Sequence, residues 1–137
     1  MIVLDTNVLS EPLKTMPAPK VMEWLDNQSA ETLFITTVSR AELRFGVLKL
    51  PDSKRKSALA AQIERVLGLF KGRTLDFDAA AADKLAEIAV RCEQAGKRAV
   101  APDAYIAACA AARGFAVATR NVGHFEHTGV RVINPWE

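Results

Sequence analysis

Short apolar runs alternate along the chain with longer segments in which apolar residues recur every three or four positions. The runs at residues 2–4, 33–35, 74–77, 116–118 and 130–133 are short and apolar enough to be buried strands. The first run is continuously apolar, which is typical of a strand covered on both faces in a parallel sheet, and it ends abruptly in polar residues. Strands alternating with helical segments predict an α/β fold with a central parallel sheet and right-handed crossovers.

Helical periodicity fills the segments between these strands. We expect helices at about residues 7–13, 19–27, 39–49, 53–70, 79–95 and 104–113. Ser39 is the expected N-cap of the third helix, and Asp78 that of the fifth. In the third helix Ala41, Phe45 and Leu48 make one apolar stripe, and Leu43 and Val47 widen it.

Composition favours one small globular domain. The 137 residues are half hydrophobic and a quarter charged, so we expect a single domain spanning residues 1–137. No apolar run approaches the ~20 residues of a membrane span, and we see no signal-peptide pattern. We therefore expect a cytoplasmic protein in which Cys92 and Cys109 are core residues. The net charge of +2 permits a polyanionic partner without requiring one.

Four polar residues lie where predicted strands and helices meet. Asp5 and Asn121 follow the first and fourth strands, whereas Glu42 and Asp103 lie near helix starts. Local explanations exist for each: Asp5 can cap a helix, Glu42 has capping-box spacing from Ser39, and Asp103 suits the helix dipole. Asn121 can be an ordinary loop residue. In a parallel sheet, however, all four places converge on one edge.

A cluster of three carboxylates at that edge has a chemical consequence. The acids would repel one another and raise each other's pKa unless a cation neutralises them. A few hard oxygen ligands suit Mg²⁺ or Mn²⁺, which keep several waters and complete their shells with substrate phosphate. Such a set indicates metal-assisted hydrolysis of phosphodiesters.

Several short motifs occur in a specific order along the chain. They are Asp5-Thr6-Asn7, Ser39-Arg40-Ala41-Glu42-Leu43 before Phe45-Gly46, Pro102-Asp103 followed by Ile106-Ala107, Thr119-Arg120-Asn121 with His124-Phe125, and Asn134-Pro135-Trp136. In this order and spacing the chain resembles PIN-domain ribonucleases of the VapC toxin type, and among them the FitB-like branch. The resemblance covers essentially the whole chain.

The resemblance implies a PIN-like three-layer fold, with its central parallel sheet in the strand order 3-2-1-4-5. It implies that Asp5, Glu42 and Asp103 are catalytic residues that hold Mg²⁺ or Mn²⁺. Many members have a fourth acid where this chain has Asn121; an amide is a neutral ligand, so we expect metal contact there to run through water or to be weak. The expected activity is endoribonucleolytic hydrolysis to 5′-phosphate and 3′-hydroxyl ends. The expected partners are an RNA substrate, a cognate antitoxin and a second copy in a homodimer, with higher-order assembly on the antitoxin.

The residues expected to contact RNA lie beside these acids. They are Thr6, Arg40, Arg44, Thr119 and Arg120. A surface rim of arginines is also ordinary, and selectivity for one RNA cannot be derived from the sequence.

Two other functions remain open at this stage. A receiver-type phospho-acceptor domain would use Asp76 or Asp78 after the third strand, and a catalytically silent RNA-binding domain would not need the acids. His124 and His127 share helical spacing, but a zinc site needs more ligands than these two.

Overall fold

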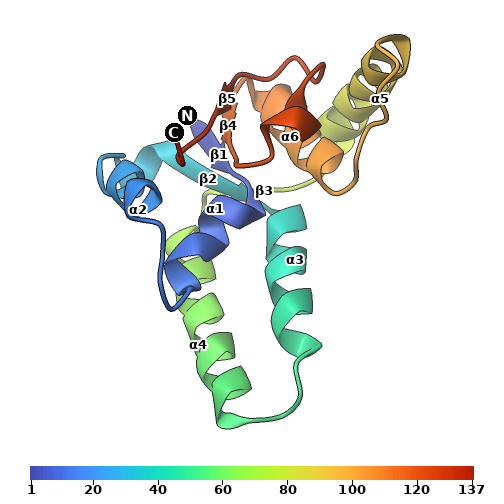
Figure 1. Ribbon diagram of the computed structural model, residues 1–137. Coiled ribbons are helices and arrows are strands. Elements are labelled where there is room, and N and C mark those ends of the chain that lie inside the picture. Colours follow the sequence, from blue (N-terminus) through green and yellow to red (C-terminus); the bar gives the residue numbers. More distant parts are fainter.

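The computed structural model describes residues 1–137 and contains one five-stranded sheet (Figure 1). The strands are β1 Ile2–Leu4, β2 Leu33–Thr36, β3 Thr74–Leu75, β4 Ala116–Ala118 and β5 Val132–Ile133. All neighbouring pairs are parallel and the order is β3-β2-β1-β4-β5, which confirms the predicted fold. In the register, Ile2 of β1 lies opposite Leu33 on one side and Ala116 on the other.

Six α-helices connect and cover these strands. They are α1 Thr6–Ser10, α2 Pro19–Asp26, α3 Thr37–Leu48, α4 Lys54–Leu69, α5 Ala79–Gln94 and α6 Asp103–Arg113. Three short 3₁₀ helices are also present: η1 Glu11–Leu13, η2 Ala30–Thr32 and η3 Val122–Phe125. None of the helices is long and apolar enough to span a membrane.

The alternation of side chains along the strands creates three layers. Val3 and Val117 point to one face, where they pack in a cluster with residues of α5 and α6. Leu4 and Ala118 point to the opposite face and join a cluster that includes residues of α1 to α4. Figure 1 shows α3 and α4 side by side as a hairpin that extends beyond the sheet, with α5 and α6 on the other side of the molecule. The sheet is therefore buried on both faces, as its apolar strands predicted.

The start of α3 corrects the sequence prediction. Thr36, not Ser39, is the N-cap, and its Oγ1 accepts a hydrogen bond from the Ser39 backbone N–H at 3.1 Å. Ser39 lies inside the first turn, so Glu42 does not occupy the capping-box position. Helix capping therefore does not explain why a glutamate occupies position 42.

The buried face of α3 also differs from the prediction. Leu43 and Val47 are buried, whereas Phe45 and Leu48 are 66% and 69% exposed. Both sets have helical spacing, and only the packing of α3 against α1 and α4 decides between them. The predicted stripe was therefore wrong for Phe45 and Leu48, whereas Leu43 and Val47, which were expected to widen it, form the buried face.

Two strands are shorter than expected. β3 ends at Leu75, and beyond it Phe77 packs edge-on against Tyr105 with ring centroids 5.4 Å apart. β5 begins at Val132 and not at residue 130. The predicted cap of α5 is confirmed, because the Asp78 side chain caps that helix, and the structure adds Ser53 as the side-chain cap of α4.

Candidate active site

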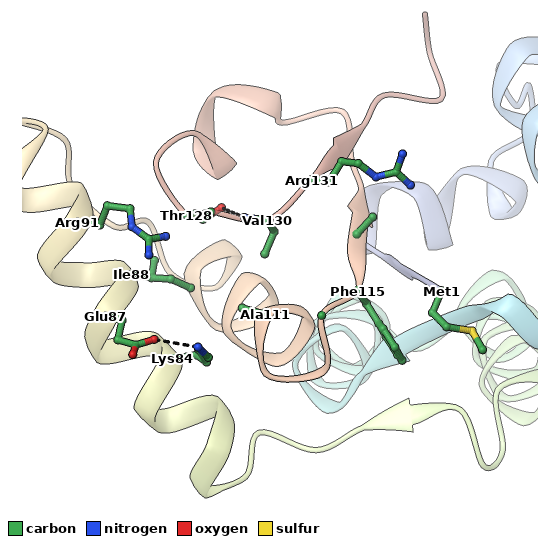
Figure 2. A pocket seen from close by; sticks show the side chains of 13 residues that line it. Met1, Lys84, Glu87, Ile88, Arg91, Ala111, Phe115, Thr128, Val130 and Arg131 are labelled. Carbon is green, nitrogen blue, oxygen red and sulfur yellow. Dashed lines mark hydrogen bonds and ion pairs between the residues drawn. The ribbon is translucent and has the colours of Figure 1, made fainter.

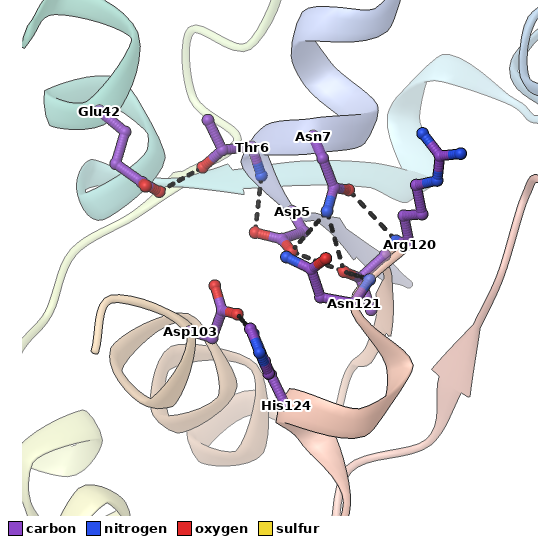
Figure 3. Close-up of polar contacts among 9 residues, drawn as sticks. Asp5, Thr6, Asn7, Glu42, Asp103, Arg120, Asn121 and His124 are labelled. Atoms are coloured by element: carbon purple, nitrogen blue, oxygen red, sulfur yellow. Dashed lines mark hydrogen bonds and ion pairs between the residues drawn. The ribbon is translucent and has the colours of Figure 1, made fainter. Parts of the chain in front are cut away.

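Four segments bring polar side chains to the carboxyl edge of the sheet (Figure 3). Asp5 follows β1, and Asn121 lies three residues beyond β4. Glu42 projects from α3, which begins directly after β2, and Asp103 opens α6. The side chains of the three acids face a common space in Figure 3. The predicted convergence of these residues on one rim is what the structure shows.

Asp5 is the most tightly held of the three acids and is only 2% exposed. Its carboxylate accepts hydrogen bonds from the Thr6 backbone N–H at 2.7 Å and the Thr119 hydroxyl at 2.6 Å. The amide of Asn7 donates to the same group at 3.3 Å. Because its backbone N–H also donates to the Ala118 carbonyl, Asp5 continues the β1–β4 ladder. Its position is thus fixed by the sheet itself.

The electrostatics of Asp5 are those of an acid without a basic partner. Burial is the main cause that raises the pKa of Asp5 to about 6, and the charges of Asp103 and Glu42 act in the same direction. The hydrogen bonds from Thr119 and Thr6 oppose the shift only in part. No lysine or arginine forms an ion pair with any of these three acids.

Glu42 is held by one neighbour. The Thr6 hydroxyl lies 2.5 Å from Glu42 Oε1 and 2.8 Å from the Ser39 hydroxyl. Partial burial, and to a smaller extent Asp103, raise the pKa of Glu42 above its ordinary value. Thr6, which was expected to contact substrate, therefore links Asp5 and Glu42 through its backbone N–H and its hydroxyl.

Asp103 has a partner that the sequence did not reveal. Its Oδ2 lies 2.6 Å from Nδ1 of His124, a residue of η3. In the sequence, His124 belonged to the motif series that carries the family resemblance and was weighed with His127 as a zinc ligand, but no contact with Asp103 was predicted. The available signal was its position three residues after Asn121, on the loop that returns to the same rim.

The threonine and asparagine after β4 have unequal positions. Thr119 is fully buried, donates to Asp5 and accepts a hydrogen bond from the Asn121 backbone N–H at 3.0 Å. Thr119 thus supports Asp5 and is not on the surface, where an RNA contact would need it. Asn121 is exposed, and its side chain lies beside Asp5 in Figure 3.

The three arginines beside the acids differ in whether their guanidinium groups are already engaged by other side chains. Arg44 pairs with Glu64 of α4 at 2.5 Å. Arg120 is exposed and its guanidinium lies 5.2 Å from the ring centroid of Trp136. Arg40 makes no ion pair or side-chain hydrogen bond, so Arg40 and Arg120 are the more available cations.

The acids do not form a closed cage for a metal ion. No three acidic, histidine or cysteine side chains lie close enough to ligate one ion directly. An ion held by all three acids would therefore be contacted partly through water. The donor set still suits a hydrated ion such as Mg²⁺, which takes one or two carboxylates directly and keeps several waters. It does not suit a tetrahedral zinc site.

A groove of about 680 Å³ adjoins the acids. Thr6 and Glu42 line its end at the rim, and residues of α1, α3 and α4 form its walls. A second pocket, of about 430 Å³, lies at the amino ends of the strands, between α5 and the segment that enters β5 (Figure 2). Since none of the acids lines this second pocket, only the groove is continuous with the candidate site.

The alternative residues Asp76 and Asp78 follow β3, which lies two strands away from β1 in the sheet. Asp78 accepts a hydrogen bond from the Ala81 backbone N–H and so serves as a helix cap. Asp76 is exposed, and β3 is the edge strand of the sheet. Cys92 and Cys109 are free and buried, and burial raises the pKa of the Cys109 thiol to about 11.

Comparison with known proteins assigns the family. The PIN domain family model matches residues 2–130. VapC ribonuclease Y4jK of Sinorhizobium fredii is 44% identical over 138 residues, covering 100% of this chain and 99% of the relative. Toxin FitB of Neisseria gonorrhoeae is 43% identical, covering 99% of each chain. A solved structure of FitAB bound to a DNA fragment has a TM-score of 0.96 at 42% identity, covering 100% of this chain and 96% of that one. The chain therefore belongs to the PIN-domain family, among the VapC and FitB toxins of toxin–antitoxin systems.

Proposed function

We propose that this chain is a divalent-metal-dependent endoribonuclease that hydrolyses RNA to 5′-phosphate and 3′-hydroxyl ends. The observation that carries the proposal is the convergence of Asp5, Glu42 and Asp103 on one rim without a lysine or arginine paired to them. A buried acid whose pKa is about 6 gains from a nearby cation. The relatives named as a VapC ribonuclease and a toxin support the same activity.

The three acids and the residues beside them would have different roles in metal and RNA binding. Asp5, Glu42 and Asp103 would hold Mg²⁺ or Mn²⁺, partly through waters, with Asn121 as a further contact through water. The bound ion supplies an activated water and stabilises charge on the phosphate. Arg40 and Arg120 would hold RNA phosphates beside the ion.

The remaining residues expected at the substrate act differently. Thr6 and Thr119 position the carboxylates through the hydrogen bonds described above. Arg44 can reach RNA only by giving up its ion pair with Glu64. A receiver-type function would need its acceptor at Asp76 or Asp78, which lie at the edge strand. A silent RNA-binding domain gains nothing from carboxylates in its groove, because phosphates repel them.

Cleavage of RNA under controlled metal content tests the proposal. We expect the wild-type chain to cut RNA with Mn²⁺, to stop when EDTA is added, and to resume when Mn²⁺ is restored in excess. Asp5→Asn, Glu42→Gln and Asp103→Asn are expected to lower the rate at least about 100-fold, because each removes charge that binds the ion. Asp83→Asn, which changes an exposed acid of α5, is the matched control. Undiminished cleavage in EDTA, or by Asp103→Asn, would overturn the assignment.

We further propose a cognate antitoxin as the inhibitory partner. The groove ends at Thr6 and Glu42, so a peptide segment lying in it reaches the acids directly. An arginine of that segment can form charge-assisted bonds with the carboxylates and displace the ion. Expression of this chain alone is then expected to slow growth, whereas Asp5→Asn is not. A small neighbouring open reading frame is expected to encode a product that co-purifies and suppresses cleavage; a harmless wild-type chain without such a product would contradict this partner.

A further inference from the structure

The three acids are supported by unequal numbers of hydrogen-bond donors. Asp5 has three, from the Thr6 backbone, Asn7 and Thr119. Glu42 has the hydroxyl of Thr6. The carboxylate of Asp103 has one side-chain partner, Nδ1 of His124 at 2.6 Å. Whatever fixes the rotation of the Asp103 carboxylate therefore comes from this imidazole.

The hydrogen bond between His124 and Asp103 makes the two carboxylate oxygens of Asp103 inequivalent. Oδ2 is engaged by His124, and the other oxygen points in Figure 3 toward the space between Asp5 and Glu42. Since an ionised carboxylate only accepts hydrogen bonds, Nδ1 carries the proton in this pair. The imidazole thus binds one carboxylate oxygen of Asp103, and the other oxygen faces Asp5 and Glu42.

The backbone around His124 gives the imidazole a fixed base. The backbone N–H of His124 donates to the backbone carbonyl of Asn121 at 3.0 Å, at the start of η3. The next residue, Phe125, is 1% exposed and belongs to the core beneath α5 and α6. Its hydroxyl-bearing neighbour Thr128 is also buried and donates to the Phe125 carbonyl. The side chain of His124 itself is 48% exposed, and its one polar contact is with Asp103.

We propose that His124 is a positioning residue of the metal centre, which orients Asp103 through Nδ1–H and so sets the affinity for the divalent ion. This inference rests on the proposed metal-dependent function. Without the contact, the carboxylate rotates about its Cβ–Cγ bond, and the oxygen aimed at the ion is no longer favoured. Partners of this kind typically change metal affinity by about 10- to 100-fold.

Calorimetric titration of the metal-free full chain with Mn²⁺ tests the proposal. We expect His124→Ala to raise the Mn²⁺ dissociation constant by about 10-fold or more. His124→Asn is expected to restore most of the affinity, because its amide nitrogen is attached to Cγ as Nδ1 is. His124→Gln is expected to behave like His124→Ala, because its amide lies one carbon further out. His127→Asn changes the other imidazole of the same loop and is the control.

Each alternative gives a different result. If His124 acts only on folding, His124→Ala lowers the thermal unfolding temperature in EDTA while the Mn²⁺ affinity is unchanged, and the proposal is wrong. If the histidine acts as a repelling charge, all three His124 variants bind Mn²⁺ more tightly, which also overturns it. A wild-type chain that binds no Mn²⁺ refutes the proposed metal centre as well. Loss in the Ala and Gln variants with recovery in Asn supports the positioning role.

Discussion

At the scale of single residues, Asp5 joins the sheet to the site. Its backbone extends the β1–β4 pairing, its side chain caps α1, and its carboxylate faces the other acids. Its place after a buried strand made Asp5 recognisable from the sequence. The donors that hold the acids were not recognisable, because Thr119 lies 114 positions from Asp5 and His124 lies 21 from Asp103. Such pairs are set by the tertiary fold and leave no local pattern.

The raised pKa of Asp5 gives a prediction about stability. In the folded chain the carboxyl binds its proton more tightly than when unfolded, with a pKa of about 6 against 3.8. Ionised Asp5 therefore destabilises the metal-free fold, and stability falls as the pH rises through this window. Relative to wild type, Asp5→Asn is expected to gain about 2 kcal/mol between pH 4 and pH 7.5, since one pKa unit equals about 1.4 kcal/mol.

Urea unfolding in EDTA at several pH values measures this difference. Subtracting wild type from variant cancels the contributions of the other titrating groups. Asp83→Asn serves as the exposed control and is expected to show a nearly constant difference. A constant difference for Asp5→Asn as well would mean that Asp5 is not held at a high pKa.

At the scale of elements, α3 shows which features of a helix a local sequence pattern predicts and which it does not. The sequence predicted the helix itself, but two caps and two apolar faces were compatible with it. Thr36 became the cap because β2 continues to that residue and leads directly into the helix. Leu43 and Val47 became the buried face because α1 and α4 cover that side. With Thr36 as the N-cap, Glu42 has no capping role. The tertiary contacts that determine the buried face of α3 also place Glu42 at the site.

The cap assignment is testable by substitution. Thr36→Ala removes the side-chain acceptor of the Ser39 N–H and is expected to lower the free energy of unfolding by about 1 kcal/mol. Thr37→Ala, one position further on, lacks a capping role and is expected to change it by less than about 0.5 kcal/mol. Chemical denaturation of both variants gives the comparison. Equal losses in the two variants would show that Thr36 does not cap α3.

At the scale of the whole molecule, order and spacing of motifs predicted more than any single motif. The parallel sheet, its strand order and the family all followed from segments spread over the chain. Convergence of Asp5, Glu42 and Asp103 on one rim followed from the topology of parallel strands. The spacing of their side chains, which is too wide for three direct ligands to one ion, did not follow, because side-chain placement within a rim depends on packing. The homodimer remains a prediction, which light scattering of the purified chain checks.

The groove beside the acids gives a prediction about the antitoxin. Gly46 of α3 lines the groove, and a Cβ there meets no atom within 4 Å. Gly46→Leu therefore places its Cβ in open space and adds a bulky side chain to the groove, and it is expected to weaken antitoxin binding at least about ten-fold. Gly68→Leu is a matched control, because Gly68 is helical, equally open and outside the groove. Thermal unfolding confirms that both variants fold, and unchanged antitoxin binding by Gly46→Leu would place the partner elsewhere.

The end groups of the cleaved RNA test the central claim most directly. Hydrolysis by a water activated at the acid cluster leaves a 5′-phosphate and a 3′-hydroxyl, and it does not use the 2′-hydroxyl as the nucleophile. We therefore expect products that a 5′-phosphate-dependent exonuclease degrades, and cleavage that continues when the nucleotide at the cut carries 2′-deoxyribose. Products that end in a 2′,3′-cyclic phosphate, or cleavage that stops with the 2′-deoxy substrate, would contradict the account.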